Sequence, residues 1–350
     1  MTYNRLPNDK IVDVAQALES TSNIAEAARM LNIPRTTFIH RMQIGIERGL
    51  IRSKEVNTET YSVDIEPNDD QDIEDIVETL TDRFKKRKNY IESKNWRQIR
   101  MKSNEPIGLL WLGDPHVDDN YCDWEKLRSH IDIIQNNDGI YGCGLGDYQN
   151  NWVGRLSRLY SEQDTSHNTA WKLVEWLINN INPLILIGGN HDMWSGSGDP
   201  LKWMTQSHTI REDWEAKVEI TFPNGEACRI HAAHDMPGHS QWNPLHAQTK
   251  MAMFKSNAHL YISGHKHIWA LAQIELTEQE SSAWLARARG YKYYDTFALT
   301  KGYDQQHFGQ AILQVINPLA QNPTGFVHCF ADVETGADYL KFLRSSTQSA

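Results

Sequence analysis

The 350-residue chain is poor in cysteine and lacks any long apolar run. Its four cysteines, Cys122, Cys143, Cys228 and Cys329, form no C-x-x-C pair, which argues against a zinc knuckle or a disulfide framework. No apolar stretch reaches the length of a membrane span, and the N-terminal MTYNRLPNDK lacks the apolar core of a secretory signal. We therefore expect a cytoplasmic protein without a membrane partner, whose oligomeric state stays open.

Basic residues are absent from residues 56–82, which carry 10 acidic side chains. The next segment, residues 83–102, reverses this balance with nine basic residues and one acidic residue. These shifts in charge mark domain boundaries. They predict a helical domain at 1–52, an acidic then basic connector at 53–103 and a larger α/β domain at 104–345. A polar helix is expected over Asp72–Arg100 of the connector.

The first domain has apolar residues at helical spacing, and it is predicted to form a helix over Asn23–Leu31, a turn, and a second helix over Pro34–Glu47. The stretch Asn32–Phe38 resembles the second half of Fis-type helix-turn-helix regulators. Residues 29–54 hold six basic residues and one acidic residue, which favours DNA as the partner over a protein-docking or purely structural module. The side chains predicted to face DNA are Arg35, Thr36, Thr37, His40 and Arg41.

The larger domain alternates apolar strand-like runs with helical stretches, a pattern typical of an α/β fold. Five of the predicted strands run directly into polar motifs that contain Asp, Asn or His. The strands are Ile107–Leu112, Ile140–Leu145, Leu184–Ile187, Cys228–Ala233 and Leu260–Ser263. Because strand ends can meet, we expect the five motifs to converge on one edge of a sheet.

The side chains in these motifs are of the kinds that bind divalent metals. The motifs supply Asp114 and His116, then Asp147, then Asn190 with His191 and Asp192, then a histidine near residue 234, and finally His265 and His267. A mixed oxygen and nitrogen ligand set without thiolate suits Mn, Fe, Zn or Ni rather than a soft metal. For the fourth motif His231 and His234 are both available, and His234 is favoured because it lies at the end of the apolar run.

The order of the five motifs resembles the calcineurin-like metallophosphoesterase superfamily, and its nuclease branch more than its protein phosphatases. The resemblance implies a β-sandwich flanked by helices that holds two divalent metal ions, with Mn preferred and Fe, Zn, Ni or Mg as alternatives. It also implies roles for single residues. One metal is expected on Asp114, His116, Asp147 and His267, and the other on Asn190, His234 and His265, with Asp147 bridging the two. His191 matches the catalytic histidine of the family, and Asp192 is expected to orient it.

Trp152 and Arg155, which follow the second motif in the sequence, are candidates for substrate contact. The run Gly146–Trp152 also resembles uncharacterised bacteriophage-encoded phosphoesterases, which would place the protein in the cytoplasm of the host. The sequence predicts a two-metal phosphodiesterase or nuclease brought to DNA by its first domain. A phosphomonoesterase that acts on a small molecule or a protein is the first alternative. The second alternative is a DNA-binding regulatory protein with a vestigial catalytic fold.

Overall fold

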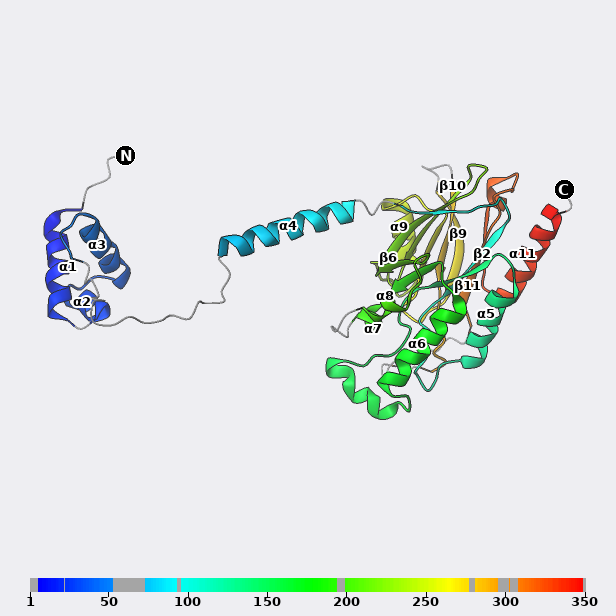
Figure 1. Cartoon of the computed structure of the whole chain (residues 1–350), viewed down its shortest axis with the longest axis horizontal. Coiled ribbons are helices and arrows are strands. Elements are labelled where there is room, and N and C mark those ends of the chain that lie inside the picture. Colours follow the sequence, from blue (N-terminus) through cyan, green and yellow to red (C-terminus); the bar gives the residue numbers. More distant parts are fainter. Residues whose placement is uncertain are drawn as a thin grey trace. The chain divides into compact units, whose positions relative to one another are not determined.

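A computed structural model of the chain describes residues 6–21, 23–52, 73–92, 96–193, 199–276, 281–294, 302 and 308–348. The chain divides into two compact units, Met1–Leu80 and Thr81–Ala350 (Figure 1). The boundary between them falls within the long helix α4 (Ile73–Glu92). No helix among the described residues is long and apolar enough to cross a membrane.

The first unit contains three short helices, α1 (Asn8–Ser20), α2 (Ile24–Met30) and α3 (Arg35–Glu47). Asn23 begins α2, because its side chain accepts a hydrogen bond from the backbone N–H of Glu26 at 3.0 Å. Buried side chains from all three helices form one core, with Val14, Ala27 and Phe38 among them. The small Ala27 and Ala28 let the helices approach closely.

The helix predicted over Asp72–Arg100 is shorter than expected. It ends at Glu92, and residues Arg97–Arg100 form strand β1, which pairs in parallel with β6 (Glu215–Thr221). The alternation of half-buried and exposed residues along β1 has the period of a strand, and Arg97 forms an ion pair with the buried Glu212 at 2.7 Å. The acidic half of the connector, residues 53–72, lies outside the described residues.

The second unit is a mixed α/β structure with two six-stranded sheets. Sheet A has the order β1, β6, β7 (Ala227–Ala233), β8 (Leu260–Ser263), β10 (Ser281–Arg287) and β9 (Ala270–Leu276). Sheet B has the order β12 (Val327–Phe330), β11 (Ala311–Ile316), β2 (Ile107–Leu112), β3 (Ile140–Gly144), β4 (Ile185–Gly188) and β5 (Ile210–Asp213). Both sheets contain parallel and antiparallel pairs.

The two sheets share a core of buried apolar residues. Leu109 and Ile187 of sheet B belong to the same buried cluster as Val218 and Ile262 of sheet A. Every residue of β2 is buried, which agrees with the continuous apolar run that predicted this strand. The shared core fixes the carboxyl ends of strands from both sheets relative to one another.

Helices cover the outer faces of the sheets. The face of sheet B turned away from sheet A packs against α5 (Trp124–Asn136), α6 (His167–Ile181) and α11 (Val333–Gln348) (Figure 1). Residues of α9 (His246–Phe254) join the outer core of sheet A. Short helical segments complete the unit: η2 (Gly154–Glu162), α7 (Asn190–Met193), α8 (Pro200–Met204) and η4 (Pro323–Gly325).

Candidate metal centre

The five polar motifs follow the carboxyl ends of strands in both sheets. β2, β3 and β4 run parallel in sheet B, so the segments that begin at Gly113, Leu145 and Gly189 leave sheet B on one side. β7 and β8 run parallel in sheet A and lead to His234 and Gly264. The expectation of a single sheet edge was therefore wrong. The cluster spans the edges of two sheets, because the shared core brings both sets of strand ends together.

Five of the seven expected metal ligands have a left-handed backbone. Their φ angles are +27° at Asp114, +40° at His116, +54° at Asp147, +66° at His265 and +52° at His267. This region is unfavourable for side chains with a Cβ, and residues held there cluster at functional sites. All five residues lie within four residues of the end of β2, β3 or β8.

Asp147 lies at the centre of the cluster and is almost fully buried. Its Oδ2 atom lies 3.3 Å from Nε2 of His234, 3.9 Å from Nε2 of His191 and 4.0 Å from Nδ1 of His265. Its Oδ1 atom accepts a hydrogen bond from the backbone N–H of His191 at 2.9 Å. One carboxylate thus faces side chains from three other motifs.

Two sets of side chains could each hold a metal ion, and both contain Asp147. One set is His116, Asp147 and His191, and the other is Asp147, His234 and His265, with the ligand atoms of each set within 4.8 Å of one another. His191 was predicted as a catalytic residue, so its presence in the first set is a second possible role. His267 lies beside this set, with its ring centroid 5.3 Å from that of His116.

The structure separates the two histidines that compete for the fourth motif. His234 points into the cluster: Nδ1 donates to the Leu145 carbonyl at 2.8 Å, and Nε2 lies 2.9 Å from Oδ1 of Asn190. With the Nδ1 proton held by a carbonyl, Nε2 is the atom left to bind a cation. His231 instead hydrogen-bonds Ser256 Oγ through Nδ1 at 2.9 Å, and its Nε2 faces Glu215.

Asp114 joins the cluster from the end of β2. The backbone N–H of His265 donates to its Oδ2 at 2.7 Å, whereas its buried Oδ1 has no hydrogen-bond partner among the described residues. Glycine at position 264 makes this contact possible, because a Cβ there would lie 2.6 Å from Oδ2. Nδ1 of His116 is likewise buried without a hydrogen-bond partner in the described part of the chain.

The two buried atoms without hydrogen-bond partners indicate whether these residues are suited to binding divalent cations. Buried polar atoms in native proteins are nearly always paired, and leaving one unpaired is costly. Here Oδ1 of Asp114 and Nδ1 of His116 are buried without a hydrogen-bond partner among the described residues, and His116 shares a set of possible metal ligands with Asp147. A cluster that contains two buried carboxylates, Asp114 and Asp147, is stabilised by a cation, so the residues fit divalent metal ions.

Asp192 was expected to orient the His191 ring, but its carboxylate bonds backbone N–H groups of two loops instead. Its carboxylate accepts hydrogen bonds from the backbone N–H groups of Asp147 at 2.7 Å, Gly189 at 2.8 Å and Tyr148 at 3.1 Å. Nδ1 of His191 bonds the carbonyl of Asn150 instead. Asp192 therefore fixes the loops after β3 and β4 relative to one another, and a carbonyl orients His191.

Burial and charge shift the pKa values of the cluster in opposite directions. Burial raises the pKa of Asp114 well above its usual range. Burial would also raise the pKa of Asp147, but the neighbouring His234, His265 and His191 together hold it well below that range. Burial lowers the pKa of His234, yet Asp147 and Asp114 outweigh this and raise it to about 10. The two carboxylates thus favour positive charge at the position of His234.

A lysine that no motif indicated lies beside the cluster. Lys292 is buried, its ammonium group pairs with Asp119 at 3.0 Å, and it lies 5.3 Å from the ring centroid of Trp152. The Trp152 ring in turn meets the His191 ring edge-on at 5.2 Å. Trp152, which was predicted to contact substrate, thus lies beside the ring of His191. The side chain of Arg155 lies outside the described residues.

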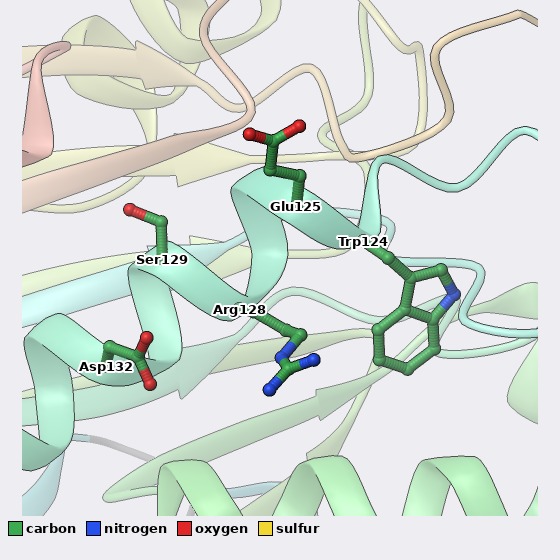
Figure 2. Close-up of a pocket in the computed structure, with 5 residues that line it drawn as sticks. All are labelled: Trp124, Glu125, Arg128, Ser129 and Asp132. Carbon is green, nitrogen blue, oxygen red and sulfur yellow. The ribbon is translucent and has the colours of Figure 1, made fainter.

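A pocket of about 470 Å³ lies elsewhere, on the surface of α5. It is lined by Trp124, Glu125, Arg128, Ser129 and Asp132 (Figure 2). None of these residues comes from the polar motifs, and their side chains include no histidine. We assign this pocket no part in the metal chemistry.

The predicted DNA-facing residues lie on the first turns of α3. Arg35, Thr36 and His40 are exposed, whereas Thr37 and Arg41 are partly buried. Phe38 faces the opposite way and is fully buried in the core of the unit, as the helical spacing predicted. The exposed face of α3 therefore includes three of the five predicted residues, Arg35, Thr36 and His40.

Comparisons with known proteins identify the first unit. Residues 14–43 match the family model described as "Bacterial regulatory protein, Fis family". No curated protein matches the chain. A crystal structure of a protein of unknown function from Aquifex aeolicus matches over 46% of this chain and 80% of its own, with 18% identity and a TM-score of 0.22. The N-terminal unit is thus a Fis-type helix-turn-helix domain, a class of domain that binds DNA.

Proposed function

We propose that the second unit is a two-metal phosphoester hydrolase of the calcineurin-like type, and that the helix-turn-helix brings it to DNA. The observation that carries this proposal is the position of Asp147. It belongs to both sets of possible metal ligands, as a carboxylate that bridges two cations must. The two face-to-face sheets with helices outside them are compatible with the β-sandwich that the motif resemblance implies.

In this proposal Asp114, His116 and His267 would hold one cation, Asn190, His234 and His265 would hold the other, and Asp147 would belong to both ligand sets. Two divalent cations, when bound, would neutralise phosphate charge and lower the pKa of the attacking water. Asp192 holds the loop after β3 next to the loop after β4, because its carboxylate accepts hydrogen bonds from the backbone N–H groups of Asp147 and Gly189. The positions of both loops therefore depend on one buried carboxylate.

His191 has the geometry of a proton donor. Its Nδ1 is held by the Asn150 carbonyl, so the tautomer is fixed and Nε2 faces Asp147. Asn151 supports the same loop by donating to the His191 carbonyl at 2.6 Å. We assign to His191, in its doubly protonated form, the transfer of the Nε2 proton to the oxygen of the leaving group, which leaves the neutral ring with its remaining proton on Nδ1.

Lys292 and Trp152 would form the side of the site that receives the substrate. The ammonium group of Lys292 can attract a phosphate, and the ring of Trp152 can stack on a base. Lys292 lies close enough to the cluster to lower the pKa values of His116 and His191, after burial as the main cause. A substrate phosphate near these histidines would meet both the cation and the ring.

The direct test is hydrolysis by the full chain after chelation and reconstitution with Mn²⁺. Substrates are bis- and mono-p-nitrophenyl phosphate beside single- and double-stranded DNA. The proposal predicts metal-dependent hydrolysis of the diester and of DNA. Hydrolysis of the monoester alone would point to a phosphomonoesterase. Absence of both metal binding and hydrolysis would contradict the proposal and favour a DNA-binding protein with a vestigial catalytic fold.

A further inference from the structure

Helix α4 carries an exposed apolar stripe. Ile73, Val77, Leu80 and Phe84 follow one another at intervals of four, three and four residues, and their exposed fractions are 69%, 51%, 54% and 66%. Intervals of four and three residues are the heptad spacing that places side chains along one seam of a helix. Such a seam on a 20-residue helix indicates a surface that packs against another helix.

The rest of the described part of α4 offers little burial to hold the helix in place. Residues 73–89 are exposed except for Ile76, which is half-buried. An isolated helix of this length is only marginally stable in water, and most helical stability in proteins comes from packing an apolar face. The aliphatic Leu80 and the aromatic Phe84 lie in the middle of the seam, where a second helix would contact them.

The charges on α4 are divided between its two halves. The first half carries Glu74, Asp75, Glu78 and Asp82, and the second half carries Arg83, Lys85, Lys86, Arg87 and Lys88. Two parallel copies of α4 would place like charges opposite one another along the whole helix. Two antiparallel copies would place the acidic half of each against the basic half of the other. The helix is therefore complementary to itself in one orientation.

The seam also matches itself in that orientation. An antiparallel pair centred on residue 82 sets Leu80 opposite Phe84 of the second copy, and Phe84 opposite Leu80. The same register sets Val77 opposite position 87, where the aliphatic stem of an arginine can cover it. One register thus aligns both the apolar seam and the charges.

From these observations we infer that α4 is a homodimerisation helix, which pairs antiparallel with α4 of a second copy of this chain. The dimer joins two helix-turn-helix domains and two copies of the second unit. Helix-turn-helix proteins that act as dimers read two half-sites. The inference is independent of the proposed hydrolase activity, because it uses no residue of the metal cluster.

Sedimentation of the full chain over a range of concentrations tests the inference. We expect a reversible dimer, and we expect Leu80→Ala with Phe84→Ala to weaken it by more than roughly tenfold, because the variant buries less apolar area. Alanine favours helix, so this variant removes the seam without lowering the helix propensity. The matched control is Thr79→Ala with Asn89→Ala, two exposed positions off the seam, which should leave the dimer intact.

Salt distinguishes the orientation. Antiparallel pairing of opposite charges weakens as the salt concentration rises, whereas parallel pairing of like charges strengthens. A wild-type chain that stays monomeric at high micromolar concentration would overturn the inference. So would a dimer that survives the seam variant or that tightens with added salt. Circular dichroism and the thermal transition of each variant verify that the rest of the chain stays folded.

Discussion

At the scale of single residues, the candidate site depends on backbone conformations that side chains rarely adopt. Asp114, His116 and Asp147 all have positive φ, as do His265 and His267. Each such residue costs free energy, on the order of 1–3 kcal/mol, and persists where the surrounding structure over-determines it. The motifs could be found in the sequence because strand ends and metal-type residues are both visible there. The left-handed backbone conformation of these residues could not be predicted from the sequence.

The fourth motif provides a matched pair of histidines for a test. We predict that His234→Ala loses the second metal ion, since its Nε2 lies beside Asp147 and Asn190. His231→Ala should keep both ions, because the His231 ring hydrogen-bonds Ser256 and lies away from Asp147. Elemental analysis of both purified variants measures this. The opposite pattern would move the ligand three residues upstream.

His191 has two candidate roles, proton donor and metal ligand, and one variant distinguishes them. We predict that His191→Ala retains metal but hydrolyses bis-p-nitrophenyl phosphate roughly 10²–10⁴-fold more slowly, the usual contribution of a positioned acid. Because His191 lies in one of the two possible metal sets, the metal content of the variant decides between the roles. Loss of one metal equivalent would show that His191 is a ligand instead.

Lys292 could not be identified from the sequence, because it follows β10 in no recognisable motif and reaches the cluster only through the fold. We predict that Lys292→Met lowers kcat/KM for the diester by roughly tenfold or more, because a cation that binds phosphate is removed, with metal content unchanged. Lys126→Met is the control, since that lysine pairs with Glu334 on the helical face of the unit. Equal kcat/KM in both variants would exclude Lys292 from substrate binding.

At the scale of elements, the sequence predicted the strands that lead to the site with small errors. β2 and β8 have the predicted bounds, β3 and β7 differ by one residue at one end, and β4 is shifted by one residue at both ends. Long apolar runs make such strands visible. β1 was missed because its four residues, Arg97–Arg100, are mostly polar and become a strand only by pairing with β6. The assembly of the motifs from two sheets likewise depends on contacts between elements far apart in the chain.

Helix α3 is the element that should contact DNA. We predict that Arg35→Ala with Arg41→Ala weakens duplex binding and reduces the salt dependence of binding by roughly one unit for each phosphate that is no longer neutralised. Lys10→Ala, a charge removed from α1 outside the turn, should have little effect on binding. Mobility-shift titrations at several salt concentrations measure both variants. An unchanged salt slope in the double variant would place the DNA contacts elsewhere.

At the scale of the whole molecule, net charge differs between segments of the chain. Residues 103–350 have a net charge of −10, which disfavours a long DNA track on this part of the second unit. We predict that removal of residues 1–55 leaves turnover of bis-p-nitrophenyl phosphate intact but reduces activity on long DNA. Parallel assays on the two substrates measure this, and equal activity on DNA with and without the segment would contradict recruitment by the helix-turn-helix.

The central claim is that Asp147 bridges two metal ions in a hydrolytic site. The most direct test compares Asp147→Asn with the unaltered chain after reconstitution with Mn²⁺, by metal content and by turnover of bis-p-nitrophenyl phosphate. The account predicts about two metal equivalents and turnover in the unaltered chain, as a two-metal site requires, with fewer equivalents and no turnover in the variant. A variant that binds two equivalents and hydrolyses the diester at a near-normal rate would contradict it.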